Sequence, residues 1–367
     1  MIVGQKVGDS PLNDPRSWPT STPASTPAST PASTPTPQPG DGSLAREWRA
    51  PFAVHVGLTL SPHGRGAGDP TFQLDVTGAV WRTSLTPAGP GTIRVLPAKP
   101  ASPPEPVSPP EPTSTPEPAS PGSRVLAYAW GPGAAWLLDA LPAALGAYDD
   151  ISGFDPSPHP LVREIANRHP GLRIGRSGRL MEALVPAILE QKVVSLEAHR
   201  AWKILLTKYG TQPPGPAPRG MRVFPPPKTW RAIPSWDWHR AGVEGVRAQT
   251  IIRAATVATG LERLLTLTTA EADRKLRTIP GIGPWTSAET RQRAVGDPDA
   301  VSVGDYNLPK AVGWALAGHP AADDAIMLEL LEPYQGHRHR VARLVELTGL
   351  RPPRRGPRMP VRDYRGF

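Results

Sequence analysis

The stretch IPGIGPWTSAETRQRAVGDPDAVSVGDYNLP, residues 279–309, combines a glycine-flanked turn with an aspartate, Asp305, that has no acid directly beside it. Two glycines, Gly281 and Gly283, let the backbone turn tightly and approach another molecule closely. Pro284 follows at the position where a helix accepts proline as its first residue, and the N-terminus of that helix would present unpaired N–H groups. Such a turn can bind an anion, for example a phosphate, without any side chain. The alternative is that it only joins two helices.

A lone carboxylate has a defined chemical use. It can stabilise a cationic, oxocarbenium-like centre that develops on one side of it, and it can orient a water molecule for attack on that centre. One acid is sufficient when the leaving group already carries positive charge, because that group then needs little protonation. The alternatives for Asp305 are a helix N-cap and a solvated loop acid.

Helices must position both features. Apolar residues recur at helical spacing in four segments. These segments are residues 177–193, 195–210, 241–260 and 267–281. Thr268 with Glu271 three residues later has the spacing of a capping box, which predicts a helix start just ahead of the turn. We therefore expect residues 151–350 to form an all-α domain.

Residues 47–150 have the pattern of a small α+β domain. Apolar and polar residues alternate in a series of short segments, which predicts antiparallel strands. These segments are residues 52–60, 71–76, 79–86, 92–97 and 124–130. Leucines at helical spacing within residues 131–146 predict a helix that covers one face of the sheet. The predicted fold class is therefore α+β, with a small antiparallel sheet and a helix followed by the all-α domain.

Fifty prolines are too many for one compact fold, and many of them lie in two tracts. Residues 1–46 form a Pro/Ser/Thr-rich tail with a repeated TPAS tetrapeptide, and residues 98–122 form a Pro-rich insertion in the sheet domain. The repeats at residues 21–40 and the insertion have too few apolar residues to bury, so we expect disordered tethers; a docking site for a proline-recognising partner is the alternative. Residues 351–367 form a basic tail with six arginines against Asp363, which could clamp phosphates or be solvated.

The 367 residues carry a formal net charge of +9, which favours an acidic partner such as nucleic acid, although a solvated basic surface is the alternative. The absence of cysteine excludes disulfides, thiolate zinc sites, iron–sulfur clusters and cysteine nucleophiles. The sequence shows no basic leader with an apolar run and no stretch of about eighteen apolar residues. We expect a soluble, cytoplasmic protein, associated with the nucleoid if it is bacterial.

The motif L-x-x-I-P-G-I-G, followed by a second helix, a short linker and G-D-Y-N-L-P, resembles the signature of the HhH-GPD (helix-hairpin-helix) superfamily of DNA glycosylases. The resemblance covers roughly residues 175–345. The preceding sheet domain resembles the N-terminal domain of the 3-methyladenine DNA glycosylase II branch, and the segments EALVPAILEQKV, IPSWDWHRAGV and LEPYQGHRHR agree with that branch. The resemblance implies a hydrolase that acts on double-stranded DNA in base excision repair.

By resemblance, Asp305 is the catalytic residue. It would stabilise the sugar cation that forms when the bond between a base nitrogen and C1′ breaks. Superfamily members that also cut the strand carry a lysine just after the hairpin, and the matching position here is Trp285, so the resemblance implies a monofunctional enzyme that leaves an abasic site. The residues that would contact DNA are Gly281, Ile282, Gly283, Thr286, Gln191 and Lys192.

The predicted base pocket is formed by Trp285, Tyr306 and Glu289. Aromatic faces stack well on an electron-poor, cationic ring, which favours alkylated purines of the 3-methyladenine and 7-methylguanine class; both aromatics could instead be core residues. Glu289 departs from the branch, which often has an aromatic at this position, so the pocket wall and its preference could differ. Lys192 matches the position of the leucine that wedges into the gap left by the flipped base.

The resemblance implies a monomer that requires no cofactor. Hairpins of this superfamily often hold a sodium or potassium ion on main-chain carbonyls, which here would be those of Arg277, Ile279 and Ile282. Three other functions are alternatives: a glycosylase for oxidised or deaminated bases, a non-catalytic helix-hairpin-helix DNA-binding protein, and a scaffold organised by the proline tracts. The combination of hairpin, aspartate and adjacent aromatic argues against mere binding, which does not need all three.

Overall fold

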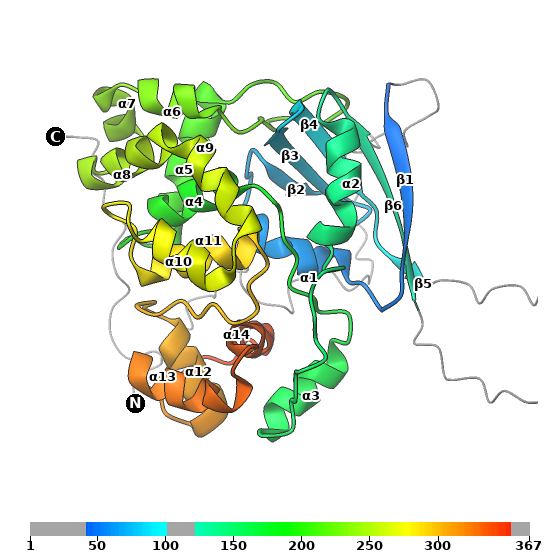
Figure 1. Cartoon of the computed structure of the whole chain (residues 1–367), viewed down its shortest axis with the longest axis vertical. Coiled ribbons are helices and arrows are strands. Elements are labelled where there is room, and N and C mark those ends of the chain that lie inside the picture. The colour runs from blue at the N-terminus through cyan, green and yellow to red at the C-terminus, as the bar shows by residue number, and fades with distance from the viewer. Residues whose placement is uncertain (1–41, 101–121, 354–367) are drawn as a thin grey trace, which may run out of the picture.

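The computed structural model describes residues 42–100 and 122–353. Most of the proline-rich tail, of the Pro-rich insertion and of the basic C-terminal tail lies outside the described residues, so the expectations for these segments stay predictions. The described part consists of an N-terminal sheet with a covering helix, followed by a helical body (Figure 1). The predicted α+β fold class is confirmed.

The N-terminal sheet is antiparallel, and its strands follow the order β1-β6-β4-β3-β2, with β5 pairing beside β6. The strands are β1 (Leu44–Ala50), β2 (Phe72–Leu74), β3 (Val80–Thr86), β4 (Gly89–Val95), β5 (Lys99–Pro100) and β6 (Ser123–Trp130). Alternation predicted β2, β3, β4 and β6. It missed β1, which begins inside the segment assigned to the tail. As an edge strand, β1 keeps most of its side chains exposed or half-exposed, so it lacks a clear apolar face.

The strand predicted at residues 52–60 is wrong. The chain there forms the short helix α1 (Val56–Leu60), which η3 (Ser61–His63) continues. Nδ1 of His55 accepts a hydrogen bond from the Leu58 N–H at 3.1 Å and so caps the helix. In a run this short, a strand and a helix would bury nearly the same apolar positions. Periodicity alone therefore does not distinguish a strand from a helix here.

The helix α2 (Ala134–Ala144) lies across one face of the sheet (Figure 1). Leu137, Leu138 and Leu141 are buried in a cluster with apolar side chains of the sheet, among them Ile93 and Val125. The leucine spacing therefore predicted both the helix and the face it covers.

The helical body contains the remaining helices of the described residues. They are α3 (Pro160–Arg168), α4 (Leu180–Leu189), α5 (Ser195–Tyr209), α6 (Pro227–Ala232), α7 (Ser235–Arg240), α8 (Gly245–Thr256), α9 (Ala258–Glu262), η4 (Arg263–Thr266), α10 (Thr269–Leu276), α11 (Pro284–Ala294), α12 (Leu308–Ala317), α13 (Asp324–Leu331), η5 (Glu332–Tyr334) and α14 (Arg338–Leu347).

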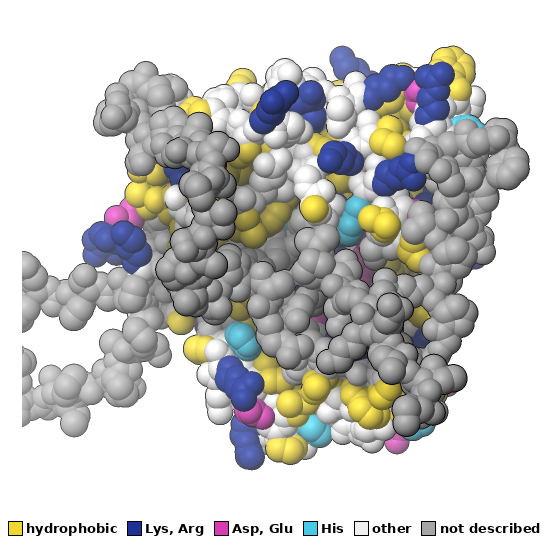
Figure 2. Space-filling model, turned by 180° about the vertical axis from the view of Figure 1, so that it is seen from behind, with side chains coloured by type: hydrophobic (Ala, Val, Ile, Leu, Met, Phe, Trp, Pro, Cys, Tyr) yellow, Lys and Arg dark blue, Asp and Glu magenta, His cyan; other side chains and the backbone are white. Residues whose placement is uncertain are grey.

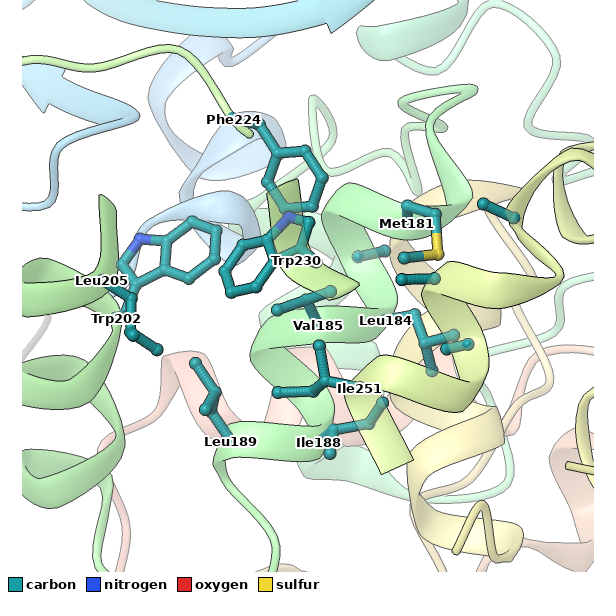
Figure 3. Close-up of a cluster of buried hydrophobic side chains, with 14 of the residues drawn as sticks. Met181, Leu184, Val185, Ile188, Leu189, Trp202, Leu205, Phe224, Trp230 and Ile251 are labelled. Atoms are coloured by element: carbon teal, nitrogen blue, oxygen red, sulfur yellow. The ribbon is translucent and has the colours of Figure 1, made fainter. Parts of the chain in front are cut away.

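The centre of this body is α4, in which every residue except Glu182 is buried. Its apolar side chains pack against α5, α8 and a group of aromatic rings (Figure 3). The rings are Trp202, Phe224 and Trp230. The same cluster includes Leu276 at the end of α10 and Ile282 in the turn that follows, so the core itself anchors the turn.

A second apolar cluster holds α3, α12, α13 and α14 together. It includes Val312 on α12, Met327 on α13 and Val341 on α14, none of which is measurably exposed. This cluster fixes α12, and Asp305 lies in the loop directly before that helix.

No helix within residues 42–100 and 122–353 is long and apolar enough to cross a membrane. Seen from behind, lysine and arginine side chains are concentrated in the upper part of the face (Figure 2). Exposed lysines and arginines occur on α5, α6 and α7, including Lys203, Lys208, Lys228, Arg231 and Arg240.

Candidate active site

The turn between α10 and α11 has the tight geometry that its glycines predicted. The capping box is confirmed: Thr268 and Glu271 exchange side-chain and backbone hydrogen bonds at the start of α10. Gly281 has a φ of +99°, and a Cβ at this residue would lie 2.2 Å from Oγ1 of Thr250 on α8. Only glycine, which has no Cβ, fits both the positive φ and the close approach of Thr250. Gly283 differs, because its φ is −95° and a Cβ would enter open space.

The helix α11 begins at Pro284, as predicted. The Ser287 N–H donates to the Gly283 carbonyl at 3.0 Å, so the N–H groups of Trp285 and Thr286 precede the first hydrogen bond inside the helix. No side chain of the described residues caps this end. The free N–H groups and the positive end of the helix dipole together favour an anion beside the turn.

Gln191, which follows α4 in the chain, forms two hydrogen bonds to the turn and to the first turn of α11. Its Nε2 donates to the Gly281 carbonyl at 2.9 Å and to Oγ1 of Thr286 at 2.7 Å. The side chains of Ile282 and Thr286 are buried, so a ligand would meet their backbone. Lys192 is exposed and has a φ of +55°, a left-handed conformation that is uncommon for a residue with a Cβ.

Three N–H donors hold the half-buried carboxylate of Asp305. Oδ1 accepts from the backbone N–H groups of Asn307 at 2.7 Å and Leu308 at 2.8 Å, at the start of α12. Oδ2 accepts from the indole Nε1 of Trp285 at 3.1 Å. Oδ1 of Asp305 therefore holds the chain where it enters α12, but the N-cap residue of that helix is Asn307 and not Asp305. Oδ2 has this one hydrogen bond within the described part of the chain, and a carboxylate oxygen can accept more.

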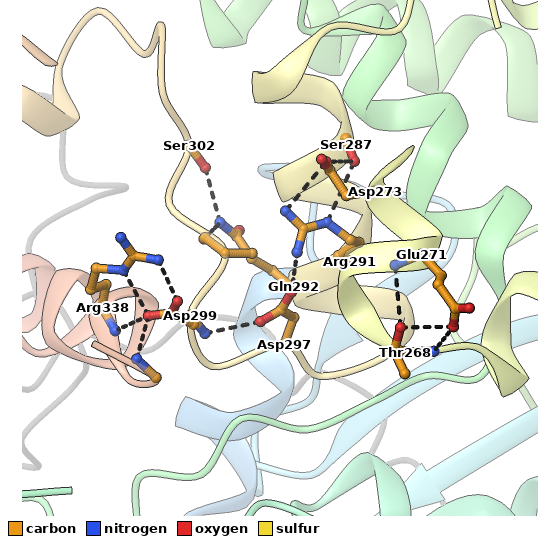
Figure 4. A network of polar contacts seen from close by, with 12 residues as sticks. Thr268, Glu271, Asp273, Ser287, Arg291, Gln292, Asp297, Asp299, Ser302 and Arg338 are labelled. Atoms are coloured by element: carbon orange, nitrogen blue, oxygen red, sulfur yellow. Dashed lines mark hydrogen bonds and ion pairs between the residues drawn. The ribbon is translucent and has the colours of Figure 1, made fainter. Parts of the chain in front are cut away.

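Polar contacts fix the linker between α11 and Asp305 (Figure 4). Two ion pairs hold its beginning: Arg291 with Asp297 and Arg338 with Asp299. Further along, Nε2 of Gln292 donates to the Ala300 carbonyl at 2.7 Å and to Oγ of Ser302 at 2.9 Å. The Gly304 N–H donates to Oδ2 of Asp324 at 3.0 Å. The loop before Asp305 is thus held along its length.

Glu289 lies one helical turn beyond Trp285, and its carboxylate is bonded within the protein. The side chain is 14% exposed, and Oε1 accepts from the Ser302 hydroxyl at 2.5 Å while Oε2 accepts from Nη1 of Arg293 at 2.7 Å. Nε of Arg293 donates to the Pro62 carbonyl at 2.8 Å. The assignment of Glu289 to the base pocket stays a prediction; the contacts place it in a half-buried polar network.

Further charged groups lie beside this network. Arg65 pairs with Glu190 at 3.3 Å. Burial opposes ionisation of Glu190, but the charge of Arg65 and a hydrogen bond from His199 outweigh burial and lower the pKa of Glu190 to about 2. Burial, followed by the charges of three nearby arginines, holds the pKa of His63 well below its ordinary value. His63 is therefore neutral at physiological pH.

Tyr306, predicted as a pocket aromatic or a core residue, is 71% exposed. The ammonium Nζ of Lys310 lies 3.4 Å from the centre of its ring, in a cation–π contact. One face of the ring is therefore already covered by the protein's own cation. Trp285, by contrast, is half-buried and directs its N–H to Asp305.

The carbonyls predicted to hold a monovalent ion belong to Arg277, Ile279 and Ile282. The Ile279 carbonyl accepts a hydrogen bond from the Ile282 N–H at 3.0 Å. A carbonyl oxygen has a second lone pair, so this bond leaves room for an ion, and the site stays a prediction. Among the residues that the structure describes, no group of three or more His, Cys, Asp or Glu side chains is arranged to hold a metal ion.

A cavity of about 560 Å³ lies between α7 and α8. Its wall includes the apolar side chains of Ile233, Trp238 and Val243, together with His239 and Glu244. None of the predicted site residues lines it. The cavity is therefore separate from the candidate active site around Asp305.

Sequence analysis did not identify Ser302, Gln292, Arg293 and Lys310. A signal existed for Arg293, because a glutamate and an arginine four residues apart on a helix commonly pair. Ser302 and Lys310 gave no comparable signal, since their contacts depend on how the linker folds back on α11 and on the direction of α12.

No protein-family model matches the chain. Two curated relatives, from the CDC 1551 and H37Rv strains of Mycobacterium tuberculosis, are each named "Probable bifunctional transcriptional activator/DNA repair enzyme AlkA". Both are 30% identical to this chain over 175 residues, which is 47% of this chain and 33% of the relative. The chain therefore spans about a third of the length of these relatives.

Solved structures share the fold over most of the chain. A 3-methyladenine DNA glycosylase from Archaeoglobus fulgidus matches with a TM-score of 0.62 and 16% identity, over 83% of this chain and 97% of that chain. An 8-oxoguanine glycosylase/lyase from Clostridium acetobutylicum, solved with double-stranded DNA, matches with a TM-score of 0.58 and 13% identity, over 84% and 98%. The predicted resemblance is confirmed at this level: the chain has the fold of the helix-hairpin-helix DNA glycosylases.

Proposed function

We propose that the protein is a monofunctional DNA N-glycosylase. It would flip alkylated purines of the 3-methyladenine and 7-methylguanine class out of duplex DNA and hydrolyse their N-glycosidic bond, leaving an abasic site for base excision repair. The observation that carries the proposal is the hydrogen bond from Trp285 to Asp305, which fixes the aspartate against the hairpin helix. Similarity to a 3-methyladenine DNA glycosylase and to AlkA proteins supports the substrate class. We further propose a monomer that acts on cytoplasmic DNA.

The hairpin supplies DNA binding in this proposal. The uncapped N-terminus of α11 and the turn at Gly281 offer backbone N–H groups to a phosphate. Contacts of this kind are blind to sequence, which suits a protein that must inspect many base pairs. Lys192, which is exposed on the neighbouring loop, is the residue that we propose enters the gap left by a flipped nucleotide.

Asp305 supplies the electrostatic part of the chemistry. When the bond between the base nitrogen and C1′ breaks, its electron pair stays with the base, and the sugar becomes an oxocarbenium-like cation. Oδ2 of Asp305, which has a single hydrogen bond, can face that cation and orient the water that attacks C1′. A purine that alkylation has made cationic leaves as a neutral base, so no strong general acid is required.

Trp285 explains why the proposed enzyme has no lyase step. Strand cleavage by the Schiff-base route requires an amine at the position just after the hairpin, and the indole of Trp285 has no nucleophilic amine. Its N–H instead orients the carboxylate. Water is therefore the nucleophile, and the product is an intact strand with an abasic site.

A second candidate is a glycosylase for an oxidised or deaminated base. The observation that favours it is the polar environment of Glu289, where the resembling branch often has an aromatic. A polar pocket can read a neutral base by hydrogen bonds, whereas an aromatic pocket favours a cationic ring by stacking. An 8-oxoguanine glycosylase/lyase is also among the proteins that share the fold.

The experiment is base release from three duplexes under single-turnover conditions: one treated with a methylating agent, one with 8-oxoguanine and one with uracil or hypoxanthine. We expect release of 3-methyladenine and 7-methylguanine, alkali-labile abasic sites, and no covalent complex after borohydride. Base release only from the duplex with 8-oxoguanine, or only from the duplex with uracil or hypoxanthine, would instead support a glycosylase for oxidised or deaminated bases. No release from any duplex, with equal affinity for damaged and intact DNA, would support a non-catalytic DNA-binding protein.

A further inference from the structure

We propose that Glu289 is a positioning residue for the carboxylate of Asp305, and that it acts through Ser302. The inference rests on the proposed function, because it assumes that Asp305 performs the chemistry. It concerns the position at which this chain departs from the resembling branch, and it gives the glutamate a role other than forming the wall of the base pocket.

The first step is the link between Ser302 and Asp305. The backbone N–H of Asp305 donates to the Ser302 carbonyl at 3.2 Å, so the two residues form one turn. Ser302 is buried, with 3% of its surface exposed. A shift of Ser302 therefore moves the backbone from which the carboxylate extends.

The second step is the contact that holds Ser302 itself. Its hydroxyl donates to Oε1 of Glu289 at 2.5 Å and accepts from Nε2 of Gln292 at 2.9 Å. The directions are consistent, because a hydroxyl both donates and accepts while an ionised carboxylate only accepts. Glu289 and Gln292 lie three residues apart on α11, on the face that also carries Trp285. One face of α11 thus holds both Ser302 and the carboxylate of Asp305.

The third step is what holds Glu289. Nη1 of Arg293 donates to its carboxylate at 2.7 Å, and Nε of Arg293 donates to the Pro62 carbonyl at 2.8 Å. Pro62 belongs to η3 in the N-terminal part of the chain. A continuous chain of hydrogen bonds therefore runs from η3 through Arg293, Glu289 and Ser302 to the loop of Asp305. An aromatic side chain at position 289 could not make it.

The test compares Ser302→Ala and Glu289→Gln with matched variants in a second triad of the same chemistry. There the Ser84 hydroxyl donates to Glu182 at 2.7 Å, and Arg82 lies 3.7 Å from the same carboxylate. This second triad joins β3 to α4, and the hydrogen bonds and ion pairs of the described residues do not connect it to the loop of Asp305. Ser84→Ala and Glu182→Gln therefore control for the loss of a buried hydrogen bond.

The full chain is used in each case. Excision is measured with methylated duplex and excess enzyme, and affinity with a duplex that carries a tetrahydrofuran abasic-site analogue. We expect Ser302→Ala to slow excision about tenfold with affinity unchanged, since a displacement on the order of 1 Å costs up to about 10²-fold in rate. Glu289→Gln should be slowed less, because its amide oxygen still accepts from Ser302. The double variant should be no slower than Ser302→Ala.

Three results would overturn the inference. The first is wild-type excision by Ser302→Ala. The second is that Ser84→Ala slows excision as much as Ser302→Ala does at an equal loss of Tm, which would mean that lower overall stability causes the slower excision. The third is a double variant whose losses multiply, which would mean that Glu289 does not act through Ser302. If the wild type itself releases no base from methylated DNA, the proposed function fails as well, and that result is distinct from the other three.

Discussion

The indole Nε1 of Trp285 lies 3.1 Å from Oδ2 of Asp305, and this hydrogen bond joins the first turn of α11 to the loop before α12. The other oxygen, Oδ1, bonds to two backbone N–H groups at the start of α12. The carboxylate is therefore oriented from both sides by elements that the two apolar clusters of the helical body hold in place. A carboxylate oriented in advance stabilises a developing cation without the cost of reorganisation.

The first prediction removes the indole donor. Trp285→Phe keeps an aromatic ring but loses the N–H that bonds to Asp305. A hydrogen bond to a charged group contributes about 1.5–3 kcal/mol, so we expect single-turnover excision to slow by about tenfold or more. Trp236→Phe, at an exposed tryptophan on α7, is the control and should excise at the wild-type rate. Equal rates for Trp285→Phe and wild type would show that the indole N–H is dispensable.

The second prediction separates the two hairpin glycines. Gly281→Ala forces a side chain into a left-handed conformation and against Thr250, and the backbone term alone costs roughly 1–2 kcal/mol. We expect a lower Tm and weaker binding to damaged and intact duplex alike. Gly283→Ala meets open space at an extended φ, so its Tm should stay within about a degree of the wild type. Equal behaviour of both variants in thermal unfolding and anisotropy would contradict the geometry described for the turn.

Much of the fold could be predicted because its periodic segments are buried on one side. The sheet strands β3, β4 and β6 and the helices α2, α4 and α10 all have apolar faces or caps that the sequence displays. β1 could not be recognised, because an edge strand with arginines and a glutamate has little apolar face to display. α1 was predicted as a strand because five residues are too few to distinguish the two periods.

The third prediction concerns the cation beside the site. Lys310 lies over the exposed ring of Tyr306, the residue that follows Asp305. If Lys310 meets a phosphate, Lys310→Gln should weaken binding and reduce the slope of log affinity against log salt by about one. Lys228→Gln, at an exposed lysine on α6, should leave that slope unchanged. A salt titration in which both variants match the wild type would exclude a phosphate contact at Lys310.

The fourth prediction follows from Glu190, whose pKa is lowered to about 2 by Arg65 and His199 against the opposing effect of burial. Because the folded-state pKa lies below the ordinary value of 4.5, the stabilisation is complete above about pH 4.5 and is lost as pH falls towards 2. The lowered pKa corresponds to a stabilisation on the order of a few kcal/mol at neutral pH.

Urea unfolding between pH 6 and pH 3 measures this effect. The stability gap between wild type and Glu190→Gln should narrow as the pH falls. Glu164→Gln, in an exposed ion pair on α3, should show a small gap throughout, since surface pairs contribute little. A gap for Glu190→Gln that is independent of pH would mean that the pairing with Arg65 is not the source of the stabilisation.

The site could be predicted only in part. The hairpin and Asp305 carry their own signature in residue types, and the structure places Trp285 and Gln191 against them. The contacts around Glu289 could not be read from the sequence, because Ser302 bonds to Glu289 from the linker and Pro62 bonds to Arg293 from a distant segment. The exposure of Tyr306 likewise depends on the direction in which the chain enters α12.

The most direct test of the central claim is single-turnover release of methylated purines by the wild type and Asp305→Asn, with alkali added afterwards to reveal abasic sites. Asparagine keeps an oxygen that can accept from the Asn307 and Leu308 N–H groups but lacks the negative charge. We predict that the variant binds damaged DNA as the wild type does and excises at least roughly 10²-fold more slowly, the size expected for loss of a key electrostatic group. Excision by Asp305→Asn at the wild-type rate would contradict the account.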